Sequence, residues 1–328
     1  MSRLVTIYGG SGFIGRYIAR RMSRRGWRVR VAVRNTNDAG FVRTYGVVGQ
    51  VVPVFCNILD DASVAAAMHD SDAVVNCVGI LSEWRSNRFD AIQAEGAGRI
   101  ARIAAEQGIP RMVHISAIGA DPESRSDYAR TKAMGEEAVL RHMPDTVILR
   151  PSLVFGPEDR LFNRFATMSR LSPVLPIAGG KSRFQPVYVD DVAAAAEKGA
   201  IGEAGAGIYE LGGPEVTTFR ELMERMLTII RRRRMIVNLP FWLGRVIAAG
   251  LSVLQWVSFG LFRNDTLTFD QLRNLARDNV VGEGSNSLRT LGIRPTPMQA
   301  VLPEYLWRFR RGGQYADLHA STRDQLSG

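Results

Sequence analysis

Three glycines near the start of the chain have the spacing of a phosphate-binding turn. Gly9, Gly12 and Gly15 follow the apolar run Leu4–Tyr8 and open a segment whose apolar residues recur at helical spacing. The first glycine permits a tight turn, the second lets the backbone approach a pyrophosphate at the positive end of the helix, and the third lets helix and strand pack closely. This context predicts a dinucleotide-binding turn, and the alternative is an ordinary connection between a strand and a helix.

The residue after the next β-like run indicates which dinucleotide. Arg34 follows Trp27–Val33 and lies 19 residues beyond Gly15. An acidic residue here would accept a hydrogen bond from the ribose 2′-hydroxyl of NAD, whereas a guanidinium pairs with the oxygens of a 2′-phosphate. We therefore predict NADP(H), with Arg16 as a second contact. The alternative is a solvated strand-end arginine, because arginines are abundant in this chain and Asp38 lies nearby.

These residues must be positioned by strands that alternate with helices. Such alternation requires crossovers between parallel strands, and a parallel sheet is covered on both faces. We therefore predict an α/β fold, a doubly wound parallel sheet of the Rossmann type. The candidate strands are Leu4–Tyr8, Trp27–Val33, Val51–Phe55, Ala73–Val78, Met112–Ile115 and Val147–Leu149, and the candidate helices are Phe13–Arg25, Ala62–Met68, Ala94–Gln107 and Ala129–Leu140.

The alternation loosens after Arg150, where prolines and glycines become frequent. Pro186–Val189 then predicts an extended stretch that leads into a capped helix. We expect a dinucleotide-binding domain over residues 1–212, with a loop-rich excursion at 156–185, and a smaller, mainly helical domain over 213–328. Phe219–Arg231 is its first predicted helix.

Composition limits the class of protein. The 328 residues are 46% hydrophobic and 23% charged, which are ordinary values for a globular chain. Cys56 and Cys77 have neither disulfide nor zinc spacing, so we expect buried thiols and no metal site. The N-terminus resembles no export signal, which predicts a protein that is not exported. The net charge of +10 favours anionic partners. Nucleic acid is disfavoured, because the arginines lack an interleaved aromatic surface.

A basic run precedes a long apolar stretch in the second half. Arg231–Arg234 comes before residues 239–262, whose only charge is that of Arg245. The length would suffice for a membrane span, but polar residues fall on one side of the helical projection. We therefore predict an amphipathic helix, not a span, that faces a membrane surface or an acidic protein. The alternative is a helix packed on its own domain.

Further motifs occur in a characteristic order. Together they resemble the extended and atypical branches of the short-chain dehydrogenase/reductase superfamily over roughly residues 1–215. The motifs are Gly9–Gly15, Asn57–Asp60, Asn76–Gly79, Ser116, Tyr128–Lys132 and Arg150–Pro157.

The resemblance implies roles for particular residues. Ser116, Tyr128 and Lys132 would form the catalytic group, in which the tyrosine exchanges a proton, the lysine lowers the pKa of the phenol and the serine orients a carbonyl. Lys132 would alternatively bind only the ribose hydroxyls. The residues implied to contact the cofactor are Gly9, Gly12, Phe13, Ile14, Gly15, Arg16, Arg34, Asn57, Ile58, Val78, Gly79, Tyr128, Lys132, Pro151, Ser152 and Phe155.

A narrower resemblance covers most of the chain to about residue 310. Residues 126–136, 155–166, 184–193, 239–242 and 278–281 are similar to the nucleotide-binding accessory subunit of respiratory complex I, the NADH:ubiquinone oxidoreductase. In that family NADP(H) is structural, and the subunit lies against the peripheral arm near the membrane. The resemblance implies a bacterial version at the cytoplasmic face of the cell membrane. A free NADP-dependent reductase, dehydrogenase or epimerase is the alternative, and a regulator that senses NADP(H) is a third.

Overall fold

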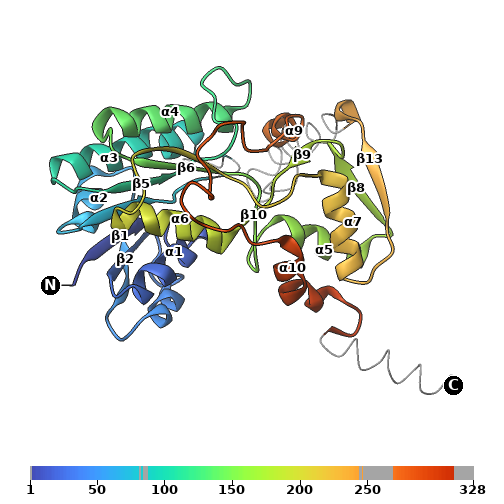
Figure 1. The fold of residues 1–328 in the computed structure, drawn as a ribbon, viewed down its shortest axis with the longest axis horizontal. Coiled ribbons are helices and arrows are strands. Elements are labelled where there is room, and N and C mark those ends of the chain that lie inside the picture. Colours follow the sequence, from blue (N-terminus) through green and yellow to red (C-terminus); the bar gives the residue numbers. More distant parts are fainter. Residues whose placement is uncertain (1, 81–82, 84–87, 244–245, 247–268, 314–328) are drawn as a thin grey trace, which may run out of the picture. The chain divides into compact units, whose positions relative to one another are not determined.

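The computed structural model describes residues 2–80, 83, 88–243, 246 and 269–313, which form two compact units (Figure 1). The first unit combines Met1–Ser152, Val189–Gly212 and Val281–Pro295, and the second combines Leu153–Tyr188, Gly213–Val280 and Thr296–Gly328. The sequence predicted one boundary at residue 212, whereas the chain enters each unit three times. One reason is that the backbone N–H of Glu210 donates to the carbonyl of Asn286 (2.8 Å), which joins the late segment to the edge of the first unit.

A sheet of seven parallel strands forms the centre of the first unit. Its order is β11-β6-β5-β4-β1-β2-β3, so the direction of strand addition reverses beside β1, where doubly wound folds bind ligands. The sequence patterns predicted the first six strands closely. The strands are β1 (Leu4–Tyr8), β2 (Arg28–Val33), β3 (Val51–Phe55), β4 (Ala73–Asn76), β5 (Met112–Ile115), β6 (Val147–Pro151) and β11 (Gly207–Leu211).

Helices cover both faces of this sheet, as a parallel sheet requires (Figure 1). α1 (Phe13–Arg24) and α6 (Val189–Ile201) pack together on one face, and α2 (Asp61–Met68), α3 (Gly96–Glu106) and α4 (Asp127–His142) pack on the other. A short 3₁₀ helix, η1 (Gly40–Tyr45), follows β2, and a π-helical turn, η2 (Asp90–Glu95), precedes α3. The predicted Rossmann-type architecture is confirmed.

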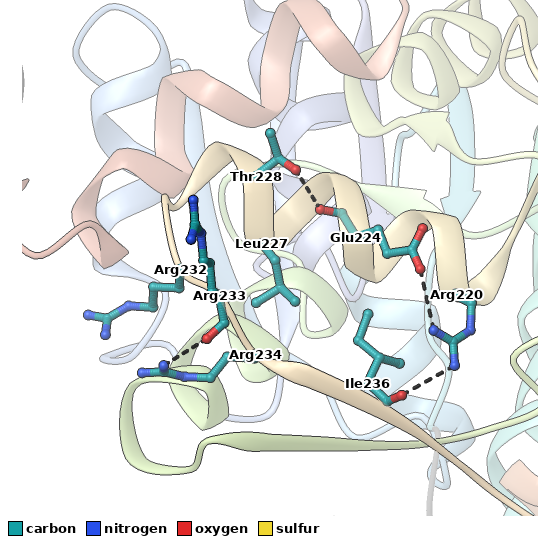
Figure 2. A pocket seen from close by; sticks show the side chains of 8 residues that line it. All are labelled: Arg220, Glu224, Leu227, Thr228, Arg232, Arg233, Arg234 and Ile236. Carbon is teal, nitrogen blue, oxygen red and sulfur yellow. Dashed lines mark hydrogen bonds and ion pairs between the residues drawn. The ribbon is translucent and has the colours of Figure 1, made fainter.

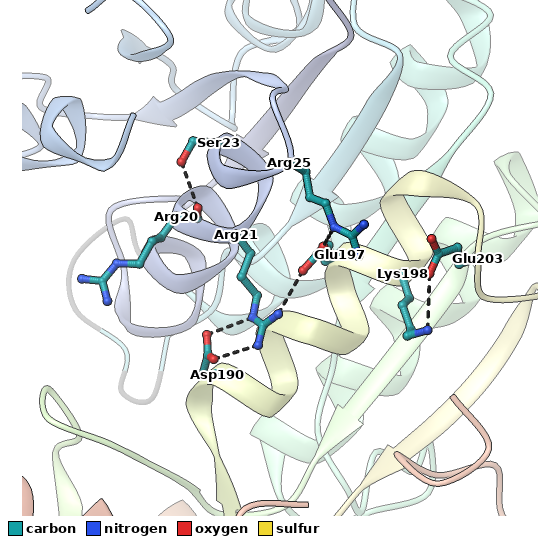
Figure 3. A network of polar contacts seen from close by, with 8 residues as sticks. All are labelled: Arg20, Arg21, Ser23, Arg25, Asp190, Glu197, Lys198 and Glu203. Carbon is teal, nitrogen blue, oxygen red and sulfur yellow. Dashed lines mark hydrogen bonds and ion pairs between the residues drawn. The ribbon is translucent and has the colours of Figure 1, made fainter. Parts of the chain in front are cut away.

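Ion pairs join α1 to α6 (Figure 3). The Arg21 guanidinium forms a fork on the Asp190 carboxylate, with N···O distances of 2.9 and 2.7 Å. Its third nitrogen donates to Glu197 at 3.1 Å, and Arg25 also donates to Glu197. Glu197 is buried, so the two guanidiniums offset the desolvation of its charge. This cluster fixes the packing of α1, the helix that begins at the glycine turn.

The second unit consists of helices around an aromatic and aliphatic core, accompanied by short strand pairs. β8 and β13 form a parallel pair, and Phe162, Leu175 and Leu222 are among its fully buried core side chains. The elements are β7 (Val154–Phe155), α5 (Leu161–Leu171), β8 (Val174–Ala178), β9 (Arg183–Phe184), β10 (Val187–Tyr188), β12 (Thr217–Thr218), α7 (Phe219–Ile229), β13 (Met235–Leu239), α9 (Phe269–Leu275), α10 (Met298–Leu306) and η3 (Trp307–Phe309).

Three local predictions need correction. Leu239, the expected first residue of an amphipathic helix, ends β13, because Met235–Leu239 pairs in parallel with β8. The helix expected over Ala94–Gln107 contains the end of the π-helical turn, so its α-helical part begins at Gly96. Cys77 is only partly buried, because it follows the last residue of β4, whereas Cys56 is buried as predicted.

The remainder of the predicted amphipathic helix at 239–262 lies largely outside the described residues. Trp242 and Val246 are described, and their side chains are exposed. Within the part of the chain that the structure describes, no helix combines the length and apolar character needed to cross a bilayer.

Candidate functional site: a dinucleotide cradle

The glycine turn lies at the carboxyl end of β1, and its backbone fits only glycine at two positions. Gly9 has a φ of +73°, in the left-handed region that favours glycine. A Cβ added to Gly15 would lie 2.5 Å from the carbonyl oxygen of Gly9 and 2.7 Å from the Cα of Gly10. Hydrogen bonds hold the turn closed, since Gly9 N–H donates to Ala32 (3.0 Å) and Gly12 N–H to Gly9 (2.9 Å). The turn therefore holds the start of α1 tightly against β1.

The start of α1 is arranged to receive an anion. Gly12 is the N-cap residue and provides no side-chain cap, and the described first turn contains no acidic residue. The N–H groups of Phe13, Ile14 and Gly15 have no carbonyl partner within the helix, because the first such bond runs from Arg16 to Gly12 (3.1 Å). Uncapped N–H groups at the positive end of a helix are a general phosphate-binding arrangement.

Two arginines lie on the elements that bound this turn. The Arg16 guanidinium donates to the carbonyls of Gly12 (3.2 Å) and Ser11 (3.1 Å) and stacks on Phe41, with 4.9 Å to the ring centroid. Arg34 is exposed and follows β2 directly. Asp38, the residue that weakened the prediction of NADP(H), accepts a hydrogen bond from the Asn35 amide at 2.7 Å. Its carboxylate is therefore already engaged within the loop.

The expected adenine-side residues follow β3, at the same edge of the sheet. The side-chain oxygen of Asn57 accepts from the N–H of Leu59 (3.2 Å), and its own N–H donates to Ser63 (2.9 Å). Ile58 is buried, and its carbonyl accepts from Arg99 at 3.0 Å. The backbone after β3 is thus fixed by local hydrogen bonds.

Val78 and Gly79 follow β4, next to β1 in the sheet. The buried Asn76 amide shapes this turn, because its oxygen accepts from Val78 N–H at 3.0 Å while its nitrogen lies 3.2 Å from Nδ1 of His114. Gly79 is exposed, and a Cβ added there would lie 3.4 Å from Lys132 Nζ. The structure therefore brings Gly79 and Lys132 close together.

Lys132 is a buried cation with one hydrogen bond from its ammonium, to the carbonyl of Ile115 at 3.0 Å. Burial lowers its pKa to about 8, and the nearby Glu136 and Cys77 oppose that shift. Glu136 is itself held by the Arg150 guanidinium through N···O distances of 2.9 and 2.6 Å. A lysine of this kind can donate hydrogen bonds to hydroxyls and lower the pKa of a neighbouring phenol.

Ser116 and Tyr128 complete the implied catalytic group. Ser116 follows β5 and is 4% exposed, and within the described chain its Oγ has no hydrogen-bond partner. Tyr128 lies one helical turn before Lys132 on α4, so both side chains occupy the same face of the helix. The Tyr128 ring meets that of Phe89 edge to face, with centroids 6.1 Å apart.

The residues expected at the nicotinamide end fall into both units. Pro151 ends β6, and Ser152 N–H donates to the carbonyl of Leu211 at 2.9 Å, so both are buried beside β11. Phe155 belongs to the second unit, where it is fully buried and its ring centroid lies 5.7 Å from that of Tyr188.

The residues of the first unit fit a dinucleotide. A turn too tight for a Cβ on Gly15, an uncapped helix start and an Oγ of Ser116 that has no partner among the described residues all belong to this unit. Phe13, Ile14 and Gly15 would hold the phosphates, and Lys132 would hold ribose hydroxyls. A nicotinamide, when bound, supplies hydride chemistry. No group of histidine, cysteine and acidic side chains within the described residues is arranged to hold a metal ion.

Sequence reasoning missed the buried polar residues behind the site. His114 is 1% exposed, and burial lowers its pKa to about 3, so the ring is neutral. Gln93 is equally buried and donates to the carbonyl of Ile80 at 2.8 Å. Each is a single polar residue among apolar neighbours in the sequence, and that pattern was the only signal that could have identified it.

Comparisons with known proteins agree with this geometry. Residues 5–198 match the NAD dependent epimerase/dehydratase family. NADH dehydrogenase (ubiquinone) 1 alpha subcomplex subunit 9, mitochondrial, of Arabidopsis thaliana is 35% identical over 94% of this chain and 79% of its own length. The NADH-ubiquinone oxidoreductase 40 kDa subunit, mitochondrial, of Neurospora crassa is 30% identical over 98% of this chain and 83% of its own.

A solved structure shares the fold. The UDP-glucose 4-epimerase of Thermus thermophilus, solved in complex with NAD, superposes with a TM-score of 0.67 at 20% identity, over 94% of this chain and 99% of that one. The fold is thus the NAD(P)-binding Rossmann fold. The chain belongs to the NAD dependent epimerase/dehydratase family and, within it, to the group that contains these mitochondrial NADH dehydrogenase subunits.

Proposed function

We propose that this chain is an accessory subunit of respiratory complex I, in which a bound dinucleotide stabilises the subunit and is not turned over. The observation that carries the proposal is the identity of 30–35% with complex I subunits over nearly the whole chain. Relatives that matched only the Rossmann unit would be compatible with the function of any member of this large family, because one fold hosts many functions. Here the similarity also extends through the second unit.

The proposed nucleotide is NADP(H). The support is Arg34, exposed immediately after β2, and the prior engagement of Asp38 by Asn35. Arg34→Gln should weaken the binding of NADPH about tenfold and that of NADH less than twofold, because only the former carries a 2′-phosphate. Calorimetric titration of both nucleotides measures this difference.

Arg28→Gln is the matched control, since Arg28 is also exposed and lies at the opposite end of β2. It should change neither affinity by as much as twofold. Equal weakening of NADPH and NADH by Arg34→Gln would refute the assignment of NADP(H).

We further propose that the subunit lies on the peripheral arm, at the cytoplasmic face of the membrane. The support is the net charge of +10 and the basic run Arg231–Arg234, which would face acidic protein or lipid. The proposal of a bound nucleotide does not depend on this location. It holds whichever peripheral-arm subunits the chain contacts, and with or without a membrane contact.

Co-purification tests the assembly. Membranes are solubilised with a mild detergent, complex I is isolated by an affinity tag on another subunit, and this chain is sought by mass spectrometry. We expect stoichiometric retention of the chain, together with NADPH released on denaturation. Recovery of the chain only in the soluble fraction would overturn the proposal.

A free reductase is the second candidate, favoured by the buried Lys132 and the unpartnered Oγ of Ser116. In that function Tyr128 would pass a proton to a carbonyl oxygen oriented by Ser116, and Lys132 would lower the pKa of the phenol. Tyr128→Phe separates the candidates. Unchanged assembly and NADPH content support a structural nucleotide, whereas loss of an NADPH-oxidising activity found in the wild type supports a reductase.

A further inference from the structure

A pocket of about 340 Å³ lies beside α7 in the second unit, and arginines surround it (Figure 2). Arg232, Arg233 and Arg234 come from the segment between α7 and β13, and Arg220 comes from the first turn of α7. Leu227 and Ile236 supply an apolar part of the lining. The volume is within the range of small-molecule sites and far exceeds that of one water molecule.

Backbone carbonyls, not carboxylates, bind the guanidiniums of Arg232 and Arg234. Arg232 donates to the carbonyl of Phe309 (3.0 Å), and Arg234 donates to those of Ser169 (2.7 Å) and Arg233 (3.0 Å). Among the described residues, no carboxylate forms an ion pair with Arg232, Arg233 or Arg234. The one acidic residue of the lining, Glu224, pairs with Arg220 at 3.4 Å.

No described carboxylate therefore compensates the positive charge of Arg232, Arg233 and Arg234. Burial and the charges of Arg234, Arg311 and Arg170 lower the pKa of the Arg232 guanidinium. Carbonyls orient Arg232 and Arg234 without neutralising them, so the cost of holding these side chains is met before any ligand arrives. Such an arrangement attracts anions strongly.

The charge and shape select among anions. The four arginines and Glu224 leave a net charge of +3 in the lining. A carboxylate brings one charge and two oxygens, whereas a phosphate monoester brings about −1.5 to −2 and three acceptor oxygens. A phosphate can therefore accept hydrogen bonds from more guanidiniums than a carboxylate can. Leu227 and Ile236 can receive the apolar part of the molecule that carries it.

We infer that this pocket is a binding site for a phosphate monoester group, carried either by a lipid headgroup or by a soluble metabolite. The site is separate from the dinucleotide cradle and rests only on residues of the second unit. The inference does not depend on whether the chain is a complex I subunit. In a subunit near a membrane, it would tie the second unit to phosphate-bearing lipid.

The test compares two neighbouring arginines in the full chain. Arg233→Gln removes an exposed member of the lining, and Arg231→Gln is the control, because it makes the same change next to the pocket but outside its lining. Inorganic phosphate is titrated calorimetrically in a phosphate-free buffer of low ionic strength. Vesicles of phosphatidylcholine with and without phosphatidic acid are tested by flotation. Phosphate that binds at the glycine turn contributes equally to both variants, because both leave that turn intact, so the difference between them reports on the arginine pocket alone.

We expect Arg233→Gln to weaken binding about tenfold and Arg231→Gln to weaken it less than twofold. Arg233→Lys keeps the positive charge but removes the two parallel N–H donors of the guanidinium, and it should weaken phosphate binding about threefold. This variant also tests the inference if Arg233→Gln fails to fold. A selective loss with inorganic phosphate supports a soluble ligand, and one confined to phosphatidic acid vesicles supports a lipid. Equal effects of the two glutamine variants, or tighter binding of a polyglutamate peptide that phosphate does not displace, would overturn the inference.

Discussion

Two arginine clusters, one in each unit, treat positive charge in opposite ways. In the first unit, Arg21 on α1 and Arg25 directly after it are neutralised by Asp190 and the buried Glu197. In the second unit, Arg232 and Arg234 are oriented by carbonyls, and no described carboxylate neutralises them. The first arrangement joins two helices, whereas the second leaves charge available to a ligand. An excess of arginine thus has different consequences according to what lies opposite each guanidinium.

The glycine turn presents backbone N–H groups at the start of α1, and its disruption should have the largest effect. Gly15→Ala places a Cβ where the backbone of Gly9 and Gly10 lies, so the turn must open. We expect NADPH binding to weaken more than 100-fold and unfolding free energy to fall by about 2 kcal/mol. Phosphate binding to the arginine pocket should be unchanged.

Gly40→Ala is the control for this variant, because a Cβ on Gly40 meets nothing within 4 Å and its φ is not positive. Calorimetry and urea denaturation of both variants provide the measurements. Retention of nucleotide binding by Gly15→Ala would show that the cradle does not position the phosphates.

For the ion pairs of Arg21 and Arg25 with Glu197, we expect an effect on stability alone. Glu197→Ala leaves two guanidiniums without their shared buried partner, and we expect a loss of about 2 kcal/mol in unfolding free energy, since both arginines are partly solvated. Glu203→Ala removes only the exposed pair with Lys198 and should cost less than about 0.5 kcal/mol. Equal losses in urea denaturation would mean that the network does not join the helices.

The buried lysine predicts the smallest effect, and it depends on pH. Below about pH 8 Lys132 is charged in both states, and the cost of burying it is fully present. Between about 8 and its ordinary value of 10.5, the unfolded chain holds a proton that the folded chain lacks, so stability rises with pH. From pH 7.5 to 9, unfolding free energy should rise by about 1 kcal/mol more in the wild type than in Lys132→Met.

Lys198→Met is the comparison for this measurement, because Lys198 is paired with Glu203 and less buried. It should show the pH dependence of the wild type. Identical pH profiles for the wild type and Lys132→Met would contradict the lowered pKa.

Most of the first unit follows from local patterns. Leu4–Tyr8 and Val51–Phe55 are strands with the predicted bounds, because short β-branched runs flanked by turns specify buried parallel strands. The second unit was less predictable. Leu239 belongs to a strand because β8, some 60 residues earlier, offers a pairing edge that no local pattern reveals.

The candidate site was predictable to a similar extent. Gly9 and Gly15 could be named because their motif lies between a strand and a helix, and Lys132 because the order of motifs resembles a known family. The surroundings of Lys132 could not, since its pKa depends on burial and on Cys77, which comes from a separate segment, as well as on Glu136 one turn later on α4. The role of Arg34 stays a prediction.

The sequence by itself determined the Rossmann-type alternation, the glycine turn and the excess of arginine. These depend on residue type and short-range spacing, which the chain carries locally. Only the tertiary structure decided which arginines are neutralised and which face a pocket, because that depends on carboxylates and carbonyls far away along the chain. Glu197 reaches Arg21 across 176 positions, and Phe309 reaches Arg232 across 77.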